Sequence, residues 1–246
     1  MDYTSIYINM FIILIQAFKA LLPYFLIVIA IILIKRKQQK KKTALKEYKQ
    51  KQPINLDYEQ SDYYKETHTS YEDMIIDKGK AGEYAAYRNI CNISGYKKFL
   101  FNVYVEDSKN SAKKTEIDLL LIHETGLYVI ECKNFKGWIY GDETSEKWCQ
   151  VFKNGKKFFF YNPIKQNYKH IQYLRHIVGT DKEITSIITF GDDATLKKIT
   201  NTNDNLKIIN NRELKRTLEN KIRYMETRLQ PEQVDELYNK LKAKQW

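Results

Sequence analysis

Two apolar runs joined by a short turn constrain this chain more than any other feature, because both carry acids in segments that a buried sheet would fill with aliphatic side chains. The first run spans residues 116–123 and the second 127–133, with Gly126 at the reversal between them. Both are dense in Leu, Ile and Val, which is typical of strands buried on both faces, and the glycine suits a tight turn. The sequence therefore predicts a β-hairpin within a central sheet.

The predicted hairpin brings charged side chains together. Glu131 and Lys133 stand two apart on one strand and so share a face, about 7 Å apart, whereas Cys132 points to the other face. If Asp118 pairs with residue 131 or 133, as a two- or four-residue loop would give, all three charged side chains share one face. A three-residue loop would place Asp118 on the opposite face.

Two carboxylates buried together require a cation, since an unpaired buried carboxylate costs several kcal/mol. Lys133, a metal ion or both can supply that charge, and carboxylate oxygens suit Mg²⁺ or Mn²⁺. The alternative is that Glu131 and Lys133 form a solvated ion pair at a strand end while Asp118 caps a turn, which is the commoner role of an isolated E-x-K tripeptide.

Further short motifs surround the hairpin in a fixed order. They are Gly79-Lys80-Ala81-Gly82-Glu83, Glu116-Ile117-Asp118, Glu131-Cys132-Lys133-Asn134, Gly137-Trp138-Ile139-Tyr140-Gly141, Trp148-Cys149-Gln150 and Asn162-Pro163-Ile164-Lys165-Gln166-Asn167. Together they resemble the nuclease-related domain (NERD) family, a branch of the restriction-endonuclease-like PD-(D/E)xK superfamily. The resemblance runs from about Lys78 to Val178.

This resemblance implies roles for individual residues. Asp118 and Glu131 would hold the metal, with Glu83 as a further acid near it on the first helix. Lys133 would position or activate the attacking water, and Gln166 would flank the site on a helix. In related nucleases a tyrosine follows that glutamine by four residues, whereas this chain has His170 at that position.

Phosphodiester hydrolysis fits these residue types independently of the family. The reaction needs a water activated near neutral pH and charge neutralisation at the phosphate, and a carboxylate-held Mg²⁺ supplies both. Lys133 can orient the water or, with a lowered pKa, act in proton transfer, and the sequence leaves both roles open.

The amino-terminal segment from Ile6 to Ile34 is apolar almost throughout, broken by Lys19 and Pro23 among others. A membrane helix needs about 20 residues, so the sequence predicts a single transmembrane span over residues 1–34. Residues 35–51 hold nine basic residues and one acid, which account for +8 of the formal net charge of +11. This run predicts that the amino terminus lies outside the cell and the domain after residue 35 in the cytoplasm. It favours contacts with anionic lipid over contacts with nucleic acid.

Few basic residues remain for nucleic acid outside that run. The candidates for phosphate contacts near the hairpin and the predicted site are Lys109, Lys113, Lys114, Lys136, Lys147 and His170. The aromatic rings of Trp138 and Trp148 are expected in a core, whereas the segment from Phe158 to Tyr161 suits either a core or a stacking platform for bases.

The fold class expected is α/β: a restriction-endonuclease-like core with a mixed central sheet flanked by helices, preceded by the transmembrane helix. Residues 35–77 would form a basic juxtamembrane segment followed by a polar, tyrosine-rich linker or loosely docked extension, and residues 78–246 the nuclease-like domain. Expected in order are a helix (79–92), a strand (99–105), the hairpin, short strands near Trp138, Trp148 and Phe158, a helix (163–178), strands at 184–190 and 206–210, and two last helices.

The function expected is a membrane-anchored, Mg²⁺- or Mn²⁺-dependent nuclease that hydrolyses DNA, or less readily RNA, at the cytoplasmic face. The competing hypothesis is a catalytically inactive module that keeps the fold and binds nucleic acid or a protein partner near the membrane. The complete set of Asp118, Glu131 and Lys133 favours the enzyme.

Overall fold

The computed structural model describes residues 3–51, 58–107 and 110–243, which fall into an amino-terminal unit and a folded domain. The amino-terminal unit is one helix, α1 (Tyr3–Lys51). Within the described part of the chain, no helix combines the length and the apolar character needed to cross a membrane. The span expected between Ile6 and Ile34 is therefore not supported by the structure.

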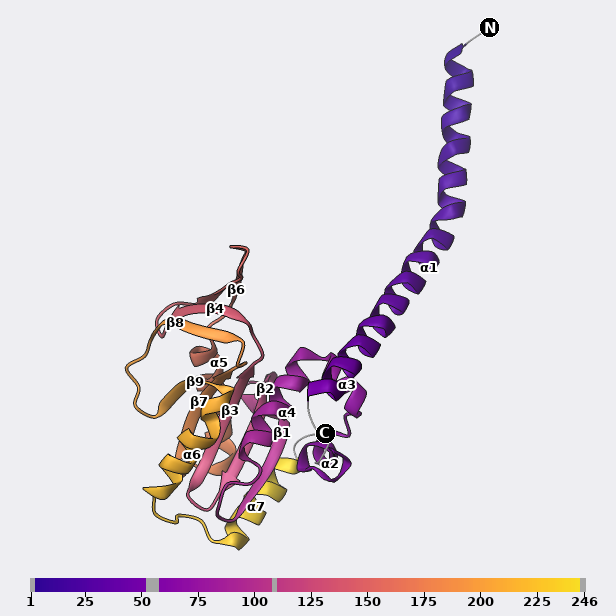
Figure 1. Ribbon diagram of the computed structural model, residues 1–246. Helices are drawn as coiled ribbons and strands as arrows, with labels where there is room; N and C mark the ends of the chain where they lie inside the picture. Colours follow the sequence, from indigo (N-terminus) through magenta and orange to yellow (C-terminus); the bar gives the residue numbers. More distant parts are fainter. Residues whose placement is uncertain (1–2, 52–57, 108–109, 244–246) are drawn as a thin grey trace. The chain divides into compact units, whose positions relative to one another are not determined.

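The domain is built on a five-stranded mixed sheet in the order β1-β2-β3-β7-β9 (Figure 1). Its strands are β1 (Lys97–Asp107), β2 (Asn110–His123), β3 (Gly126–Lys133), β7 (Ile184–Phe190) and β9 (Leu206–Asn210). The first three pair antiparallel, whereas β7 runs parallel to both β3 and β9. The central strand β3 is buried along nearly its whole length, as its largely apolar sequence predicts.

Helices cover both faces of this sheet. On one face, α4 (Lys78–Ile90) and α6 (Leu214–Arg223) pack their apolar side chains with alternate residues of β1, β2 and β3. On the other, α5 (Pro163–Val178) and α7 (Pro231–Lys242) do the same. The α/β class with a helix-flanked mixed sheet is thus confirmed.

A second, four-stranded sheet is also mixed and has the order β6-β5-β4-β8. Its strands are β4 (Gly137–Asp142), β5 (Lys147–Val151), β6 (Lys157–Tyr161) and β8 (Ala194–Thr200). One face packs Ile139, Trp148 and Phe160 against β7 and β9. The first three strands were expected, but β8 was not, because its lysines and threonines obscure an alternating pattern of partly buried side chains.

The expected linker is structured at its carboxyl end. Residues 58–77 contain a 3-10 helix, η1 (Tyr58–Gln60), and two short helices, α2 (Asp62–Thr67) and α3 (Tyr71–Ile76). Tyr63 and Met74 are almost fully buried in the core beneath α4. The linker expectation is wrong for this segment because tyrosine rings provide the buried apolar surface that a count of aliphatic residues overlooks.

Candidate active site

The hairpin register determines which charged residues meet. The β2–β3 pairing ends at His123 opposite Gly126, so the loop holds only residues 124 and 125. This is the two-residue alternative, and Leu119 opposite Ile130 places Asp118 beside Glu131. Gly126 has a φ of 137° and an ideal Cβ there would lie 2.9 Å from the carbonyl oxygen of Glu183, so no other residue fits this reversal without strain.

Asp118 lies across the hairpin from the end of β3. Its Oδ2 accepts a hydrogen bond from the backbone N–H of Cys132 at 2.7 Å. Burial, reinforced by the charge of Glu131, raises the pKa of Asp118 well above its usual range. Burial and the like charge of Glu131 therefore outweigh the positive charge of Lys133 at this position.

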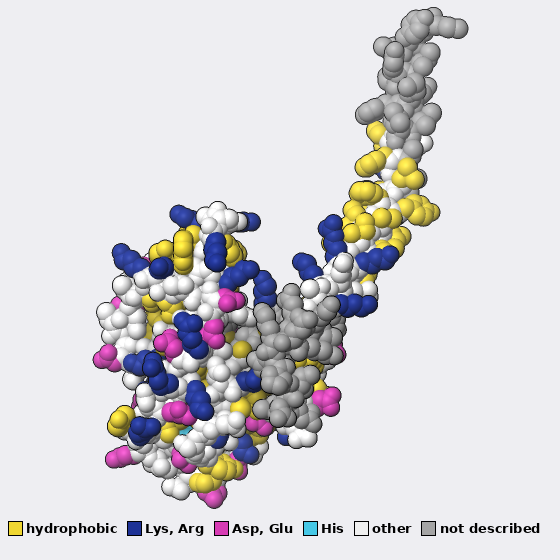
Figure 2. Space-filling view, viewed as in Figure 1, with side chains coloured by type: hydrophobic (Ala, Val, Ile, Leu, Met, Phe, Trp, Pro, Cys, Tyr) yellow, Lys and Arg dark blue, Asp and Glu magenta, His cyan; other side chains and the backbone are white. Residues whose placement is uncertain are grey.

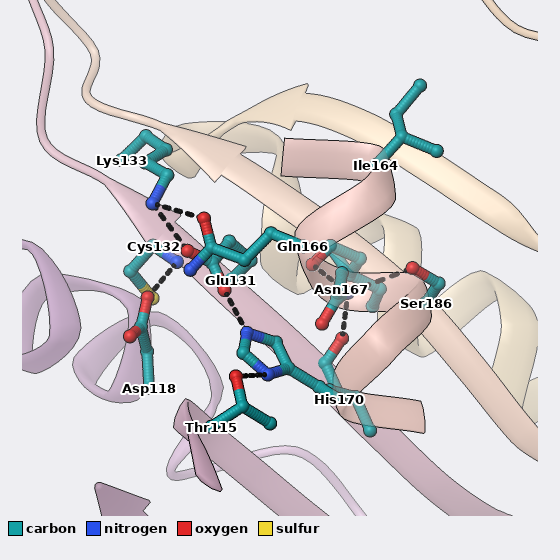
Figure 3. A network of polar contacts seen from close by, with 12 residues as sticks. Thr115, Asp118, Glu131, Cys132, Lys133, Ile164, Gln166, Asn167, His170 and Ser186 are labelled. Carbon is teal, nitrogen blue, oxygen red and sulfur yellow. Dashed lines mark hydrogen bonds and ion pairs between the residues drawn. The ribbon is translucent and has the colours of Figure 1, made fainter. Parts of the chain in front are cut away.

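Glu131 is the most enclosed acid of the site, and its side chain is fully buried. One carboxylate oxygen, Oε1, lies 2.5 Å from the ammonium Nζ of Lys133, and the other, Oε2, lies 3.0 Å from Nε2 of His170. Burial alone would raise its pKa, but the hydrogen bond from His170 and the charge of Lys133 lower the pKa of Glu131 below the usual value. Glu131 is thus held ionised between two donors (Figure 3).

Lys133 is held by a second contact from the helix α5. Its Nζ also donates to Oε1 of Gln166 at 3.2 Å. Burial opposes the charge on this amine, but the adjacent Glu131 carboxylate outweighs that effect and raises the pKa of Lys133. The lysine is therefore an ammonium in the protein without metal, and its charge is directed at Glu131.

His170 lies behind Glu131 rather than on the surface. Its side chain is 1% exposed. Its Nδ1 lies 2.9 Å from the hydroxyl oxygen of Thr115 on β2. Both ring nitrogens are thus paired, Nε2 with the Glu131 carboxylate and Nδ1 with the Thr115 hydroxyl. The expectation that His170 contacts nucleic acid does not fit this buried position.

Two asparagines fix α5 against the sheets, and with it Gln166 and His170. The Nδ2 of Asn162 donates to the carbonyl oxygens of residues 142, 143 and 145, while its Oδ1 accepts from the N–H of Ile164 at the start of the helix. One turn on, Nδ2 of the fully buried Asn167 donates to Oγ of Ser186 at 2.8 Å and to the carbonyl oxygen of Val129 at 3.1 Å. These bonds determine how far α5 stands from β3.

Glu83 lies on α4, which covers the face of the sheet opposite α5. It is nearly buried, and its Oε2 accepts a hydrogen bond from the hydroxyl of Tyr63 at 3.3 Å. Burial raises the pKa of Glu83 to about 7. Its charge also contributes to the raised pKa of Asp118, which places Glu83 within electrostatic range of the site.

The side chains of the site differ in how well they suit a divalent cation. In the ranges the structure describes, no group of three or more His, Cys, Asp or Glu side chains is arranged to hold a metal. The two-carboxylate pair nevertheless fits one chemically, because Asp118 and Glu131 are hard oxygen donors, and burial and the Glu131 charge, which raise the pKa of Asp118, would be offset by a bound cation. Asp118 and Glu131 would hold the ion, and Glu83 would act from farther away.

The predicted phosphate-binding lysines fall in different places. Lys114 is exposed and lies 2.8 Å from Glu106 in a surface ion pair. The side chain of Lys113, and Lys109 as a whole, lie outside the described residues. Lys136 is exposed and lines a pocket of about 580 Å³ together with Lys78 and Lys133. This pocket opens directly beside the catalytic lysine candidate.

Two contributors to the site were not found from sequence. Thr115 and Asn167 are ordinary polar residues of a strand and a helix, and only the packing of α5 across β3 gives them partners at the site. The four-residue spacing from Gln166 to His170 was a usable signal, because it places both side chains on one face of a helix.

Comparisons with known proteins match the part of the chain that holds these residues. The profile of the nuclease-related domain family matches residues 78–191, which include every residue of the site except Tyr63. An uncharacterized protein of Bacillus anthracis is 32% identical over 164 residues, covering 66% of this chain and 74% of the relative. No solved structure matches the chain.

Proposed function

The chain belongs to the nuclease-related domain (NERD) family, and from this premise we propose that it is a metal-dependent nuclease of the PD-(D/E)xK type that hydrolyses phosphodiester bonds of DNA. One observation carries the proposal: Asp118 and Lys133 meet at Glu131, which is fully buried yet ionised. Maintaining a buried charge beside a second carboxylate is costly, because a charge taken out of water loses its hydration.

The proposed roles follow from the contacts. Asp118 and Glu131 would hold Mg²⁺ or Mn²⁺, which would lower the pKa of a water and neutralise charge at the phosphate. Lys133, as an ammonium, orients the attacking water and stabilises the developing negative charge, and Gln166 keeps the amine in place. His170 holds the Glu131 carboxylate in one orientation, since it donates from the side opposite Lys133.

A catalytically inactive binding module is the second candidate. One observation favours it: the described residues offer no ready three-ligand metal cluster. RNA rather than DNA as the substrate is a further outcome that the same experiment resolves.

The test uses the full-length protein with circular, linear and single-stranded DNA and with RNA, in Mg²⁺, Mn²⁺ or EDTA. Metal-dependent cutting that is lost in both Asp118→Asn and Lys133→Met supports the nuclease. Lys215→Met is the matched control, because this exposed lysine lies on α6 and pairs with Glu219 of the same helix. A folded protein that binds nucleic acid but does not cut it in any metal supports the binding module instead.

The location of the domain is proposed from sequence alone. The apolar run from Ile6 to Ile34 and the lysines after it would hold the chain in a membrane by a single pass, with the nuclease-like domain on the cytoplasmic side. A reporter fused after Trp246 should be protected from protease in intact cells. Cleavage of that reporter by external protease would contradict this topology.

A further inference from the structure

The outer face of the small sheet gathers exposed aromatic side chains. Trp138 and Tyr140 project from β4, and Phe159 and Tyr161 from β6, with exposed fractions of 42%, 36%, 61% and 49%. Their neighbours along each strand, Ile139 and Phe160, point inward to the core. The four rings therefore stand on one face, which is here called the aromatic face.

The strand register sets the spacing of these rings. Tyr140 pairs with Cys149 on β5, and Cys149 pairs with Phe159 on β6. The two rings are thus two strands apart, or about 10 Å, with a small thiol between them. In the part of the chain that the structure describes, no ring of the aromatic face packs against another aromatic ring, whereas Trp148 stacks on Phe190 in the core.

Lysines are interleaved with these rings. The four strands carry Lys147, Lys157, Lys197 and Lys198, all exposed, and one acid, Asp142. The Asp142 carboxylate already accepts four hydrogen bonds from residues 144 and 145. Nζ of Lys197 lies 5.8 Å from the ring centroid of Trp138. None of the four lysines forms an ion pair with any described residue, and Figure 2 shows basic and hydrophobic side chains together at this end of the domain.

The aromatic face is continuous with the candidate active site. The pocket beside Lys133 shares Lys136, Phe152 and Asp193 with a second pocket of about 570 Å³, which is lined by Trp138. A chain lying across the outer face can therefore pass from Trp138 over Lys136 to Lys133 without crossing the core.

We propose that the aromatic face of the small sheet binds single-stranded nucleic acid, stacking bases on Trp138, Tyr140 and Phe159 and holding phosphates with the lysines between them. Open rings spaced among unpaired cations match a flexible polyanion with apolar bases, and duplex DNA hides the faces of its bases from such rings. A second protein copy or a lipid surface lacks this alternation of aromatic and anionic groups. The inference rests on the proposed function for its class of ligand.

Binding in EDTA tests this inference separately from cleavage. The probe is a fluorescent 20-nucleotide oligothymidine, with oligouridine and a duplex of the same length as further arms. In the full-length protein, Trp138→Ala with Phe159→Ala should weaken oligothymidine binding about tenfold or more. The control, Tyr168→Ala with Tyr224→Ala, removes two exposed rings elsewhere and should change binding less than twofold.

Two further variants keep the test decisive if the alanine pair fails to fold. Trp138→Phe with Phe159→Tyr retains the rings and should retain binding. Lys157→Gln with Lys198→Gln should reduce the slope of log affinity against log salt by about 1.4, since each phosphate contact on a single strand contributes about 0.7.

Binding and cleavage together separate this surface from the nuclease site. Unchanged oligonucleotide binding in the folded alanine variant overturns the proposal. The proposal is also overturned if that variant keeps oligonucleotide binding but loses self-association or binding to anionic phosphatidylglycerol vesicles. Ring-dependent binding without any metal-dependent cutting supports this surface and contradicts the nuclease. Metal-dependent cutting together with binding that does not depend on the rings supports the nuclease and contradicts the proposed role of the aromatic face.

Discussion

Nε2 of His170 lies 3.0 Å from Oε2 of Glu131, on the opposite side of the carboxylate from the ammonium of Lys133. Each oxygen of a fully buried carboxylate thus has its own donor, one from α5 and one from its own strand. The orientation of Glu131 is therefore set by how α5 packs across β3.

We predict that His170→Ala lowers the cleavage rate by a larger factor than its modest loss of folding stability would explain. The change leaves one oxygen of Glu131 without its donor in a dry site, which costs about 1–3 kcal/mol of folding stability, and frees the carboxylate to rotate toward Lys133. Cleavage rates and thermal melts measure the two effects. His170→Gln, which can still donate from a similar distance, should recover part of the rate, and an equal loss in both variants would contradict an orienting role.

Asp118→Asn should stabilise the protein without metal while abolishing cleavage. Burial and the Glu131 charge raise the pKa of Asp118, so its contribution to stability is full below the unfolded value of 3.8 and is lost as pH rises through the higher folded value. Chemical denaturation in EDTA should therefore show the variant more stable at pH 8 and nearly equal to the natural protein at pH 3.5. Mg²⁺ should stabilise the natural protein alone, and a variant less stable at pH 8 would argue against charge repulsion.

Glu83→Gln should also stabilise the protein in a pH-dependent way, but over a different pH range. The pKa of Glu83 is raised to about 7 from 4.5, so its stabilising contribution is full below pH 4.5 and lost as pH rises through about 7. The shift corresponds to about 3 kcal/mol of folding free energy, which the neutral amide avoids while still accepting the Tyr63 hydrogen bond. Unfolding in EDTA at pH 5 and pH 8 measures the difference. A gain that is the same at both values would show that titration of Glu83 is not its source.

Local pattern was sufficient for much of the fold. The hairpin, the strand at 184–190 and the helix opened by Pro163 follow from apolar runs, a glycine turn and an asparagine cap, which act over a few neighbouring residues. The strand β8 and the helices between residues 58 and 77 were missed. Their burial depends on partners distant in sequence, as when Tyr63 packs on Phe101.

The site was partly predictable for the same reason. The pairing of Asp118 with Glu131 follows from the hairpin once its loop has two residues, a length that the sequence left open. Trp148 is buried as expected, but the expectation of a buried Trp138 was wrong, because alternation along β4 directs it outward. The contact between His170 and Glu131 depends on the distance of α5 from β3, which no local pattern encodes.

The last prediction concerns the packing of α4 beside the site. Gly82 lies where an added Cβ would stand 2.8 Å from Cβ of Asn134, the residue after Lys133, so a methyl group there must push the helix from the end of β3. In an exposed helix Gly→Ala would stabilise by about 1 kcal/mol, but here Gly82→Ala should destabilise by about 1–3 kcal/mol through overpacking. It should also lower the cleavage rate, because Glu83 moves with the helix.

The matched control is Gly79→Ala on the same helix. Its added Cβ would meet two side-chain atoms, Oδ1 of Asp77 at 3.2 Å and Oε1 of Glu83 at 3.9 Å, and neither contact is as close as that of Gly82 with Asn134, so stability should change much less. Denaturant unfolding and cleavage of both variants are measured together. If Gly82→Ala stabilised the protein by the usual helical amount and kept its activity, close contact between α4 and Asn134 would not be needed to form the site.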